Sequence, residues 1–197
     1  MEDLVVSVSD ENKMIAKTAL VAFGGKPSVY AYWDDNNKSS IDMLSCNDRP
    51  YDGVTAYSTV GLSEHSIDQT VEGVPLRVEI VGACATGYEC FPNILSSCAF
   101  NVINTKYKCY PGAIFPNVVK YYMPDSPMKH ILFVPPFLWE DKLTTLSFND
   151  KKVAWLLAIP ISEEEFEYAK EHGIDDLETL FEEYQIDIFD LKRESVK

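Results

Sequence analysis

The stretch from Phe91 to Thr105 contains no charged side chain, and so long an uncharged segment is best accommodated in the interior of a folded domain. Apolar residues recur in it at helical spacing, and Pro92 suits the first turn of a helix. The polar side of this helix would be built from Asn and Ser, so it too can face protein. The spacing predicts a central helix over 91–106, packed on a sheet, with an apolar stripe of Phe91, Ile94, Leu95, Cys98, Ala99, Val102 and Ile103.

Apolar runs on both sides of this helix predict strands. Two of them, 131–134 and 153–159, end at Pro135-Pro136 and at Pro160 and are expected inside the sheet. In 76–81, Leu76, Val78 and Ile80 alternate with Arg77 and Glu79, as in a strand with one polar face. A first helix is predicted from the N-cap Asp10 to Phe23, ended by Gly24-Gly25. Further strands are predicted over 28–33, 40–44 and 54–60, the first two joined by a hairpin turn at 34–37.

Composition changes at Ser162, since the last 36 of the 197 residues hold 13 acidic and 4 basic residues, −9 of the net charge of −14. Ser162 to Glu165 has the pattern of a capping box. Gly173 is expected to end that helix and Asp175 or Asp176 to cap a second one, with an apolar stripe of Ile174, Leu177, Leu180, Phe181 and Tyr184. We therefore expect a single α+β domain over 1–197, a mixed, largely antiparallel sheet packed with helices. Residues 1–9 are expected to be frayed, and 162–197 to form an acidic helical segment.

The charge balance limits the classes of partner. With 31 acidic and 17 basic residues, and no run of Lys or Arg longer than two, the chain is unsuited to nucleic acid or to an anionic membrane and favours a basic partner. The acidic start Met1-Glu2-Asp3 is unlike a signal peptide, and no apolar run approaches the roughly 20 residues of a spanning helix. The chain is therefore expected to be cytoplasmic.

No constellation in the sequence predicts catalysis, a metal or a cofactor. Cys84 follows a strand, but its base would have to be His130, which alternates in register with apolar residues, or the distant His65. The five cysteines, Cys46, Cys84, Cys90, Cys98 and Cys109, lack the close pair usual in zinc sites, and their odd number suits reduced thiols. Gly24-Gly25-Lys26 follows a helix, whereas a phosphate-binding loop precedes one. We expect no enzyme and no small-molecule substrate.

Several blocks together resemble the bacterial suppressor-of-fused (SUFU) domain family, most closely its small YqcF-like antitoxins. The likeness extends over nearly the whole chain from about Lys13 and includes EYAKEHG and EEYQIDIFDLKRESV in the C-terminal segment. The other blocks are LRVEIVGAC from Leu76, FPNILSSCAFNVIN from Phe91, YPGAIFPNVV from Tyr110, MKHILFVPPFLWE from Met128 and VAWLLAIPIS from Val153.

The resemblance implies a SUFU-like fold and a non-catalytic role. Bacterial members act as immunity proteins in polymorphic or LXG-type toxin systems, and the YqcF-like branch is paired with a DNA-cleaving nuclease. Together with the acidic charge, this predicts an antitoxin that covers the basic surface of a nuclease toxin. We expect the contact surface on the C-terminal segment, at Glu163, Glu164, Glu167, Glu178, Glu182 and Glu183.

Two other function classes stay open. By analogy with animal relatives, an adaptor would bind an extended peptide or a transcription-factor segment by β-strand addition at a sheet edge, near 54–60. A hydrolase dependent on Cys84 is the third.

Overall fold

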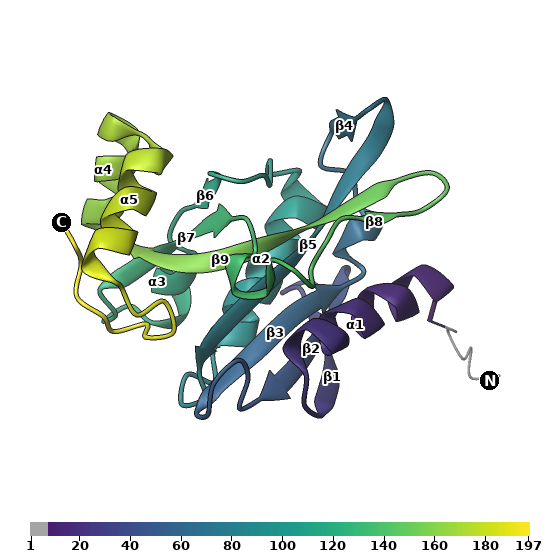
Figure 1. The fold of residues 1–197 in the computed structure, drawn as a ribbon, viewed down its shortest axis with the longest axis horizontal. Helices are drawn as coiled ribbons and strands as arrows, with labels where there is room; N and C mark the ends of the chain where they lie inside the picture. Colours follow the sequence, from purple (N-terminus) through teal and green to yellow (C-terminus); the bar gives the residue numbers. More distant parts are fainter. Residues whose placement is uncertain (1–7) are drawn as a thin grey trace.

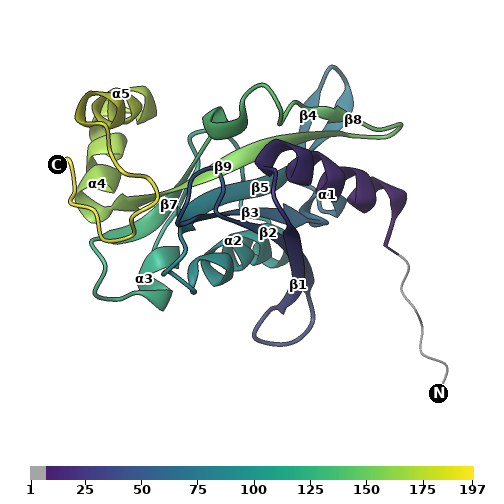
Figure 2. The same ribbon diagram turned by 60° about the horizontal axis from the view of Figure 1, so that its bottom comes forward.

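A computed structural model describes residues 8–197, which form one continuous mixed sheet with helices on both faces and at one end (Figures 1 and 2). The α-helices in these residues are α1 (Asp10–Phe23), α2 (Phe91–Thr105), α3 (Val118–Tyr122), α4 (Glu163–His172) and α5 (Ile174–Tyr184), and the 3-10 helices are η1 (Leu62–Glu64) and η2 (Phe137–Trp139). The strands are β1 (Pro27–Trp33), β2 (Ser40–Asn47), β3 (Val54–Val60), β4 (Gln69–Val71), β5 (Val74–Ala85), β6 (Ile114–Phe115), β7 (Met128–Val134), β8 (Leu146–Ser147) and β9 (Lys152–Ser162).

The sheet has nine strands in the described chain, in the order β1-β2-β3-β5-β9-β7-β6, with β4 paired to β5 and β8 to β9. All pairs are antiparallel except β5 and β9, which run parallel from Leu76 opposite Lys152 to Val81 opposite Leu157. The expected α+β class, with a mixed and largely antiparallel sheet, is confirmed. The strands β9 and β7 lie inside the sheet, as their continuous apolar runs predicted.

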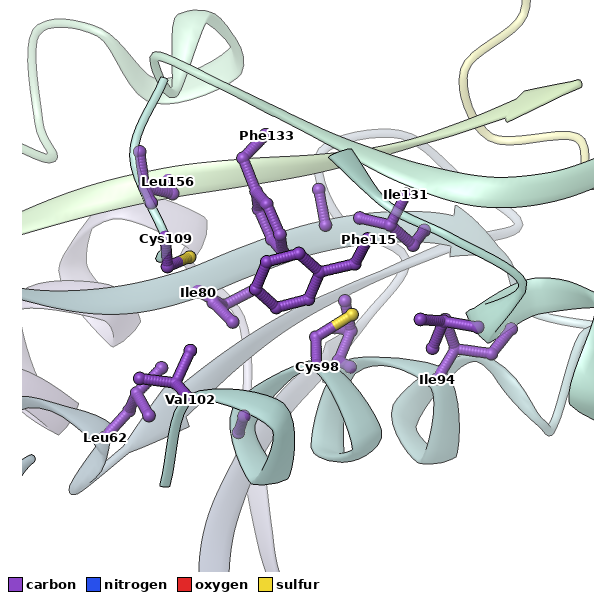
Figure 3. Close-up of a cluster of buried hydrophobic side chains, with 14 of the residues drawn as sticks. Leu62, Ile80, Ile94, Cys98, Val102, Cys109, Phe115, Ile131, Phe133 and Leu156 are labelled. Carbon is purple, nitrogen blue, oxygen red and sulfur yellow. The ribbon is translucent and has the colours of Figure 1, made fainter. Parts of the chain in front are cut away.

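Helix α2 packs on one face of the sheet and forms the larger core with it (Figure 2). All seven residues of its predicted apolar stripe are buried. Figure 3 shows Cys98 pointing from α2 toward Phe115, whose ring meets Phe133 edge-on with centroids 4.8 Å apart. Gly82 on β5 allows α2 to pack closely on the sheet, because a Cβ at this position would lie 2.9 Å from the ring of Phe91 on α2.

Helix α1 covers the opposite face of the sheet, over β2 and β3 (Figures 1 and 2). Its buried residues, Ile15, Ala19, Ala22 and Phe23, join a second core with the apolar residues of β9, η2 and the C-terminal helices. The N-cap is Ser9, whose hydroxyl accepts the Asn12 N–H at 3.1 Å, so the assignment of Asp10 as the cap was wrong by one residue. Of the residues 1–9 expected to be frayed, 1–7 lie outside the described residues.

Two sequence predictions about the sheet were wrong. The segment 54–60 is not an edge, because β3 lies between β2 and β5 and all seven of its residues are buried. Within residues 8–197, the edge strand at this end of the sheet is β1 instead. Pro160 does not end its strand, since β9 continues to Ser162. Pairing of β9 with β5 stops at Leu157, so the missing N–H of Pro160 breaks no hydrogen bond to β5.

The second C-terminal helix begins differently from the prediction. Gly173 serves as the C-cap of α4, with its N–H on the carbonyl of Ala169 at 2.9 Å, and also as the N-cap of α5. Its φ of 99° turns the chain between the two helices without a linker. Asp175 and Asp176 therefore lie in the first turn of α5, where their charges favour the helix N-terminus, and neither is the cap.

Candidate functional site

Helices α4 and α5 contact each other at the end of the sheet where β9 finishes (Figure 1). The capping box starts α4 as predicted, because the Ser162 hydroxyl accepts the Glu165 N–H at 3.0 Å and the Glu165 carboxylate accepts the Ser162 N–H at 2.9 Å. Leu177 and Phe181 of α5 are buried in the second core. The acidic C-terminal segment is thus an ordered part of the domain.

Glu165 is fully buried and anchors the end of the chain on α4. Arg193 donates two hydrogen bonds to its carboxylate, of 2.6 and 2.7 Å, and a third, of 3.1 Å, to the carbonyl of Pro160. The Val196 N–H also donates to Glu165 at 3.1 Å. The guanidinium lies 5.4 Å from the centroid of the Phe181 ring on α5. One buried ion pair therefore joins α4, α5, β9 and the C-terminal segment.

Residues 185–197 pass back along the end of the sheet. The carbonyl of Phe189 accepts the Ala85 N–H at 2.9 Å and the Cys84 thiol at 3.3 Å, next to the end of β5. Tyr88 donates to Asp190, and Ser126 donates to the carbonyl of Leu191, whose side chain enters the core under α2. Residues 185–197 are thus attached to both cores, and the acidic helices α4 and α5 pack on the second core.

The six glutamates singled out from the sequence lie on this helix pair but do not form one cluster. Glu163 and Glu167 are exposed on one side of α4. Glu163 lies 3.3 Å from Nε2 of His130, and Glu167 accepts two hydrogen bonds from Lys170, at 2.8 and 2.9 Å. Because Lys170 offsets its charge, Glu167 contributes less to the surface potential than its position in the sequence suggested.

The other four glutamates divide between open surface and a groove. Glu164 and Glu183 are exposed, and no ion pair to either occurs within residues 8–197. Glu178 and Glu182, one turn apart on α5, line the groove. The pKa of the Glu178 carboxyl is raised by its partial burial and by the negative charges of Asp175 and Glu182.

This groove is a cavity of about 590 Å³ between α5, η2 and the C-terminal segment. Tyr51, from the loop between β2 and β3, closes one side and meets the Phe189 ring edge-on with centroids 5.9 Å apart. No local pattern along the chain predicted the groove, because its walls come from segments far apart in the sequence. The apolar lining consists of Tyr51, Val134, Pro135, Phe137, Leu138, Ile159, Phe181, Ile186, Ile188 and Phe189.

Cys84 and His130, which the sequence analysis considered for nucleophilic catalysis, are both buried. Cys84 is 1% exposed, and burial raises the pKa of its thiol far above the usual range. His130 is 1% exposed, and its Nδ1 accepts the Asn117 N–H at 2.9 Å, so Nε2 carries the ring proton. Burial lowers the His130 pKa, although the charge of Glu163 acts against this. The part of the chain that the structure describes contains no hydrogen bond between Cys84 and a histidine.

Within residues 8–197, no three His, Cys, Asp or Glu side chains are grouped so that they could hold a metal ion. None of the helices in this range is long and apolar enough to cross a bilayer. All five cysteines are free thiols, and four of them are buried.

Comparison with known proteins assigns the family. The family described as Suppressor of fused protein (SUFU) matches residues 37–194, which is most of the chain. This chain therefore belongs to the SUFU family. It is similar in particular to "Immunity protein YqcF" of Bacillus subtilis (strain 168), with 56% identity over 191 residues that cover 97% of this chain and 100% of the relative.

Solved structures support the same fold at low sequence identity. A putative SUFU homologue from Neisseria gonorrhoeae has a TM-score of 0.71 at 16% identity, covering 95% of this chain and 97% of that one. The Sufu–Fu complex gives 0.67 at 14% identity, covering 94% and 92%. Drosophila Suppressor of Fused gives 0.55 at 15% identity, with 86% of this chain matched to 42% of that protein.

Proposed function

We propose that this chain is an immunity protein that neutralises a cationic nuclease toxin by binding it directly, without catalysis. The observation that carries the proposal is the acidic α4–α5 pair, held in place by the buried ion pair between Glu165 and Arg193. The name of the 56% identical relative supports the immunity role. The toxin we propose is a DNase of a polymorphic or LXG-type system, met in the cytoplasm of the producing cell.

The mechanism follows from the charge that a nuclease needs. A DNase holds phosphates on a basic surface, and a protein with 13 acidic and 4 basic residues in its last 36 positions is complementary to it. Occupying that surface excludes DNA, so the inhibitor requires no reactive group. Complementary fields also speed the encounter, and this attraction is screened beyond about 8 Å at physiological salt.

The test begins with the neighbouring gene, which the proposal predicts to encode a toxin with a basic C-terminal nuclease domain. That domain is then used as a catalytically inactive variant. Raising the salt concentration should slow association of the wild-type protein steeply and change its dissociation less. Reversal of Glu178, Glu182 and Glu183 to Lys should slow association at least about tenfold at low salt and reduce its salt dependence. The same variant should protect cells less well against the active toxin. Since all three side chains lie outside the core, the fold should persist, as checked by circular dichroism.

The matched control reverses Asp35, Glu89 and Asp150 to Lys. These are exposed residues outside the C-terminal segment, and the net charge changes by the same amount. This variant should keep most of the association rate. An equal loss of association rate in both variants would show that only the total charge of the protein matters. Full protection of cells by the variant of Glu178, Glu182 and Glu183 would rule out the acidic helices as the contact surface.

A peptide-binding adaptor is the second candidate, and the exposed edge strand β1 favours it. In the described chain β1 pairs only with β2, and its Val29, Tyr30 and Trp33 are 52%, 66% and 58% exposed. An extended peptide could add to this edge by main-chain hydrogen bonds. Replacing Ala31, in the middle of β1, with proline removes one main-chain donor. It should abolish such binding and leave toxin neutralisation intact.

A further inference from the structure

The groove beside α5 combines apolar walls with aromatic rings that stand open to solvent. Tyr51 is 61% exposed and Phe137 is 51% exposed, and both line the same cavity of about 590 Å³. Single exposed aromatic residues are ordinary on protein surfaces, whereas convergent ones around a hollow mark a contact site. The groove can therefore receive a side chain of substantial apolar area.

The acidic wall of the groove favours a ligand with positive charge. Glu178 and Glu182 both line the groove from α5, and no Lys, Arg or His of residues 8–197 forms an ion pair with either carboxylate. Glu178 is partly buried and is surrounded by the negative charges of Asp175 and Glu182, which raise its pKa. An external cation would relieve this repulsion and form charge-assisted hydrogen bonds in a partly desolvated place.

Building on the proposed function, we propose that this groove receives an apolar side chain of the toxin flanked by a lysine or arginine, which Glu178 and Glu182 bind. A second copy of this chain is a poor occupant, because each copy carries a net charge of −14 and would bring like charge to an acidic wall. A purely apolar ligand would leave the two carboxylates beside it without a counter-charge. The occupant that satisfies both walls is an amphipathic cationic segment.

Such an anchor would localise binding energy within a larger acidic surface. Interfaces concentrate their energy in a few desolvated pockets that bind aromatic or arginine side chains, surrounded by contacts of little individual weight. The exposed glutamates Glu164 and Glu183 would then set the association rate, and the groove would set the dissociation rate.

The first experiment uses two synthetic peptides as probes, acetyl-Lys-Phe-Lys-amide and acetyl-Glu-Phe-Glu-amide. Titration of the full chain, followed by methyl NMR at Ile186 and Ile188, should give saturable shifts with the lysine peptide and none with the glutamate peptide. The double variant Glu178→Gln/Glu182→Gln should bind the lysine peptide with at least about fivefold lower affinity, which corresponds to about 1 kcal/mol of binding free energy. The matched control Asp35→Asn/Asp150→Asn removes two exposed charges elsewhere and should leave the affinity unchanged.

Equal binding of both peptides, or chemical-shift changes confined to residues outside the groove, would overturn the inference.

The second experiment measures dissociation of the inactive nuclease domain from the variant Phe137→Ala/Glu178→Gln, which should be at least about tenfold faster than from the wild type. An unchanged dissociation rate would remove the groove from the toxin interface. If the wild-type protein binds the lysine peptide but not the nuclease domain, the proposed function fails, while the assignment of the groove as a site for a cationic, apolar segment remains. Dimerisation that the groove variant abolishes would assign the groove to a second copy and overturn the inference.

Discussion

Arg193 and Glu165 are 28 residues apart in the chain and meet in a buried, two-pronged ion pair, with Nη1 to Oε1 at 2.6 Å and Nη2 to Oε2 at 2.7 Å. The same carboxylate caps α4 through the Ser162 N–H. A helix start and the anchoring of the C-terminal segment thus depend on one side chain.

Replacing Arg193 with alanine should destabilise the protein by about 3–5 kcal/mol, because it leaves the Glu165 carboxylate buried without its cation. Urea unfolding would measure the loss, and hydrogen exchange should rise over 185–197 and at the start of α4. The neighbouring exposed residue provides the control, since Lys192→Ala should change stability by less than about 0.5 kcal/mol. A loss below about 1 kcal/mol for Arg193→Ala would mean that the pair contributes little.

Glu79 is predicted to give the protein an unusual pH dependence. This carboxyl is fully buried on β5 and accepts hydrogen bonds from the Thr59 hydroxyl and the N–H groups of Gly61 and Ser63, at 2.6, 3.0 and 3.0 Å. Burial outweighs these bonds and raises its pKa to about 7 from 4.5. Between these two values the folded state binds the proton more tightly, so the contribution of Glu79 to stability falls as the pH rises.

A glutamine at position 79 can accept both N–H groups on its oxygen and donate its amide to Thr59. Glu79→Gln should therefore be at least as stable as the wild type at pH 8, and the difference between the two should shrink as the pH falls to 5. Thermal unfolding from pH 5 to pH 8 would measure this. A glutamine variant that is much less stable at pH 8 would show that the ionised carboxylate stabilises the fold. His130 has the opposite dependence, since its lowered pKa costs stability as the pH falls below 6.5, but it is common to both proteins.

Leu95 lies at the centre of the α2 core and is completely buried. Leu95→Ala should cost about 2–5 kcal/mol in urea unfolding, because transfer and cavity terms add. Val21→Ala on α1 is the comparison, since that side chain is 66% exposed and its loss should cost less than about 0.5 kcal/mol. Similar small losses in both variants would place Leu95 outside the stabilising core.

The cysteines should differ sharply in reactivity. Cys46, Cys84, Cys98 and Cys109 are buried, whereas Cys90 at the start of α2 is half-buried. A thiol reagent should therefore label Cys90 first in the native protein and the other four only on unfolding, with five labels in denaturant without prior reduction. Mass spectrometry would count the labels. Fewer than five would reveal a disulfide, and stoichiometric zinc in native spectra would contradict the prediction of metal-free thiols.

The local sequence determined most of the secondary structure. Local patterns predicted the apolar stripe of the uncharged helix α2, the Ser162–Glu165 capping box and the strands β7 and β9. Each of these patterns depends on residues close together in the sequence, so the sequence alone was sufficient to predict the element. The same periodicity misjudged Glu79. Its alternation with Val78 and Ile80 indicated a polar face, and the fold covers that face instead.

Tertiary structure alone decided the order of the strands and what each polar group meets. Val54–Val60 has the same local pattern whether it lies at an edge or in the interior, and only its pairing with both β2 and β5 placed it inside. The sequence around Glu165 predicts only a helix-capping residue, and the structure adds its ion pair with Arg193, 28 positions further along the chain. The groove needs Tyr51, Phe137 and Phe181 together. Local patterns report the period of burial, whereas a site depends on which distant segments the fold brings into contact.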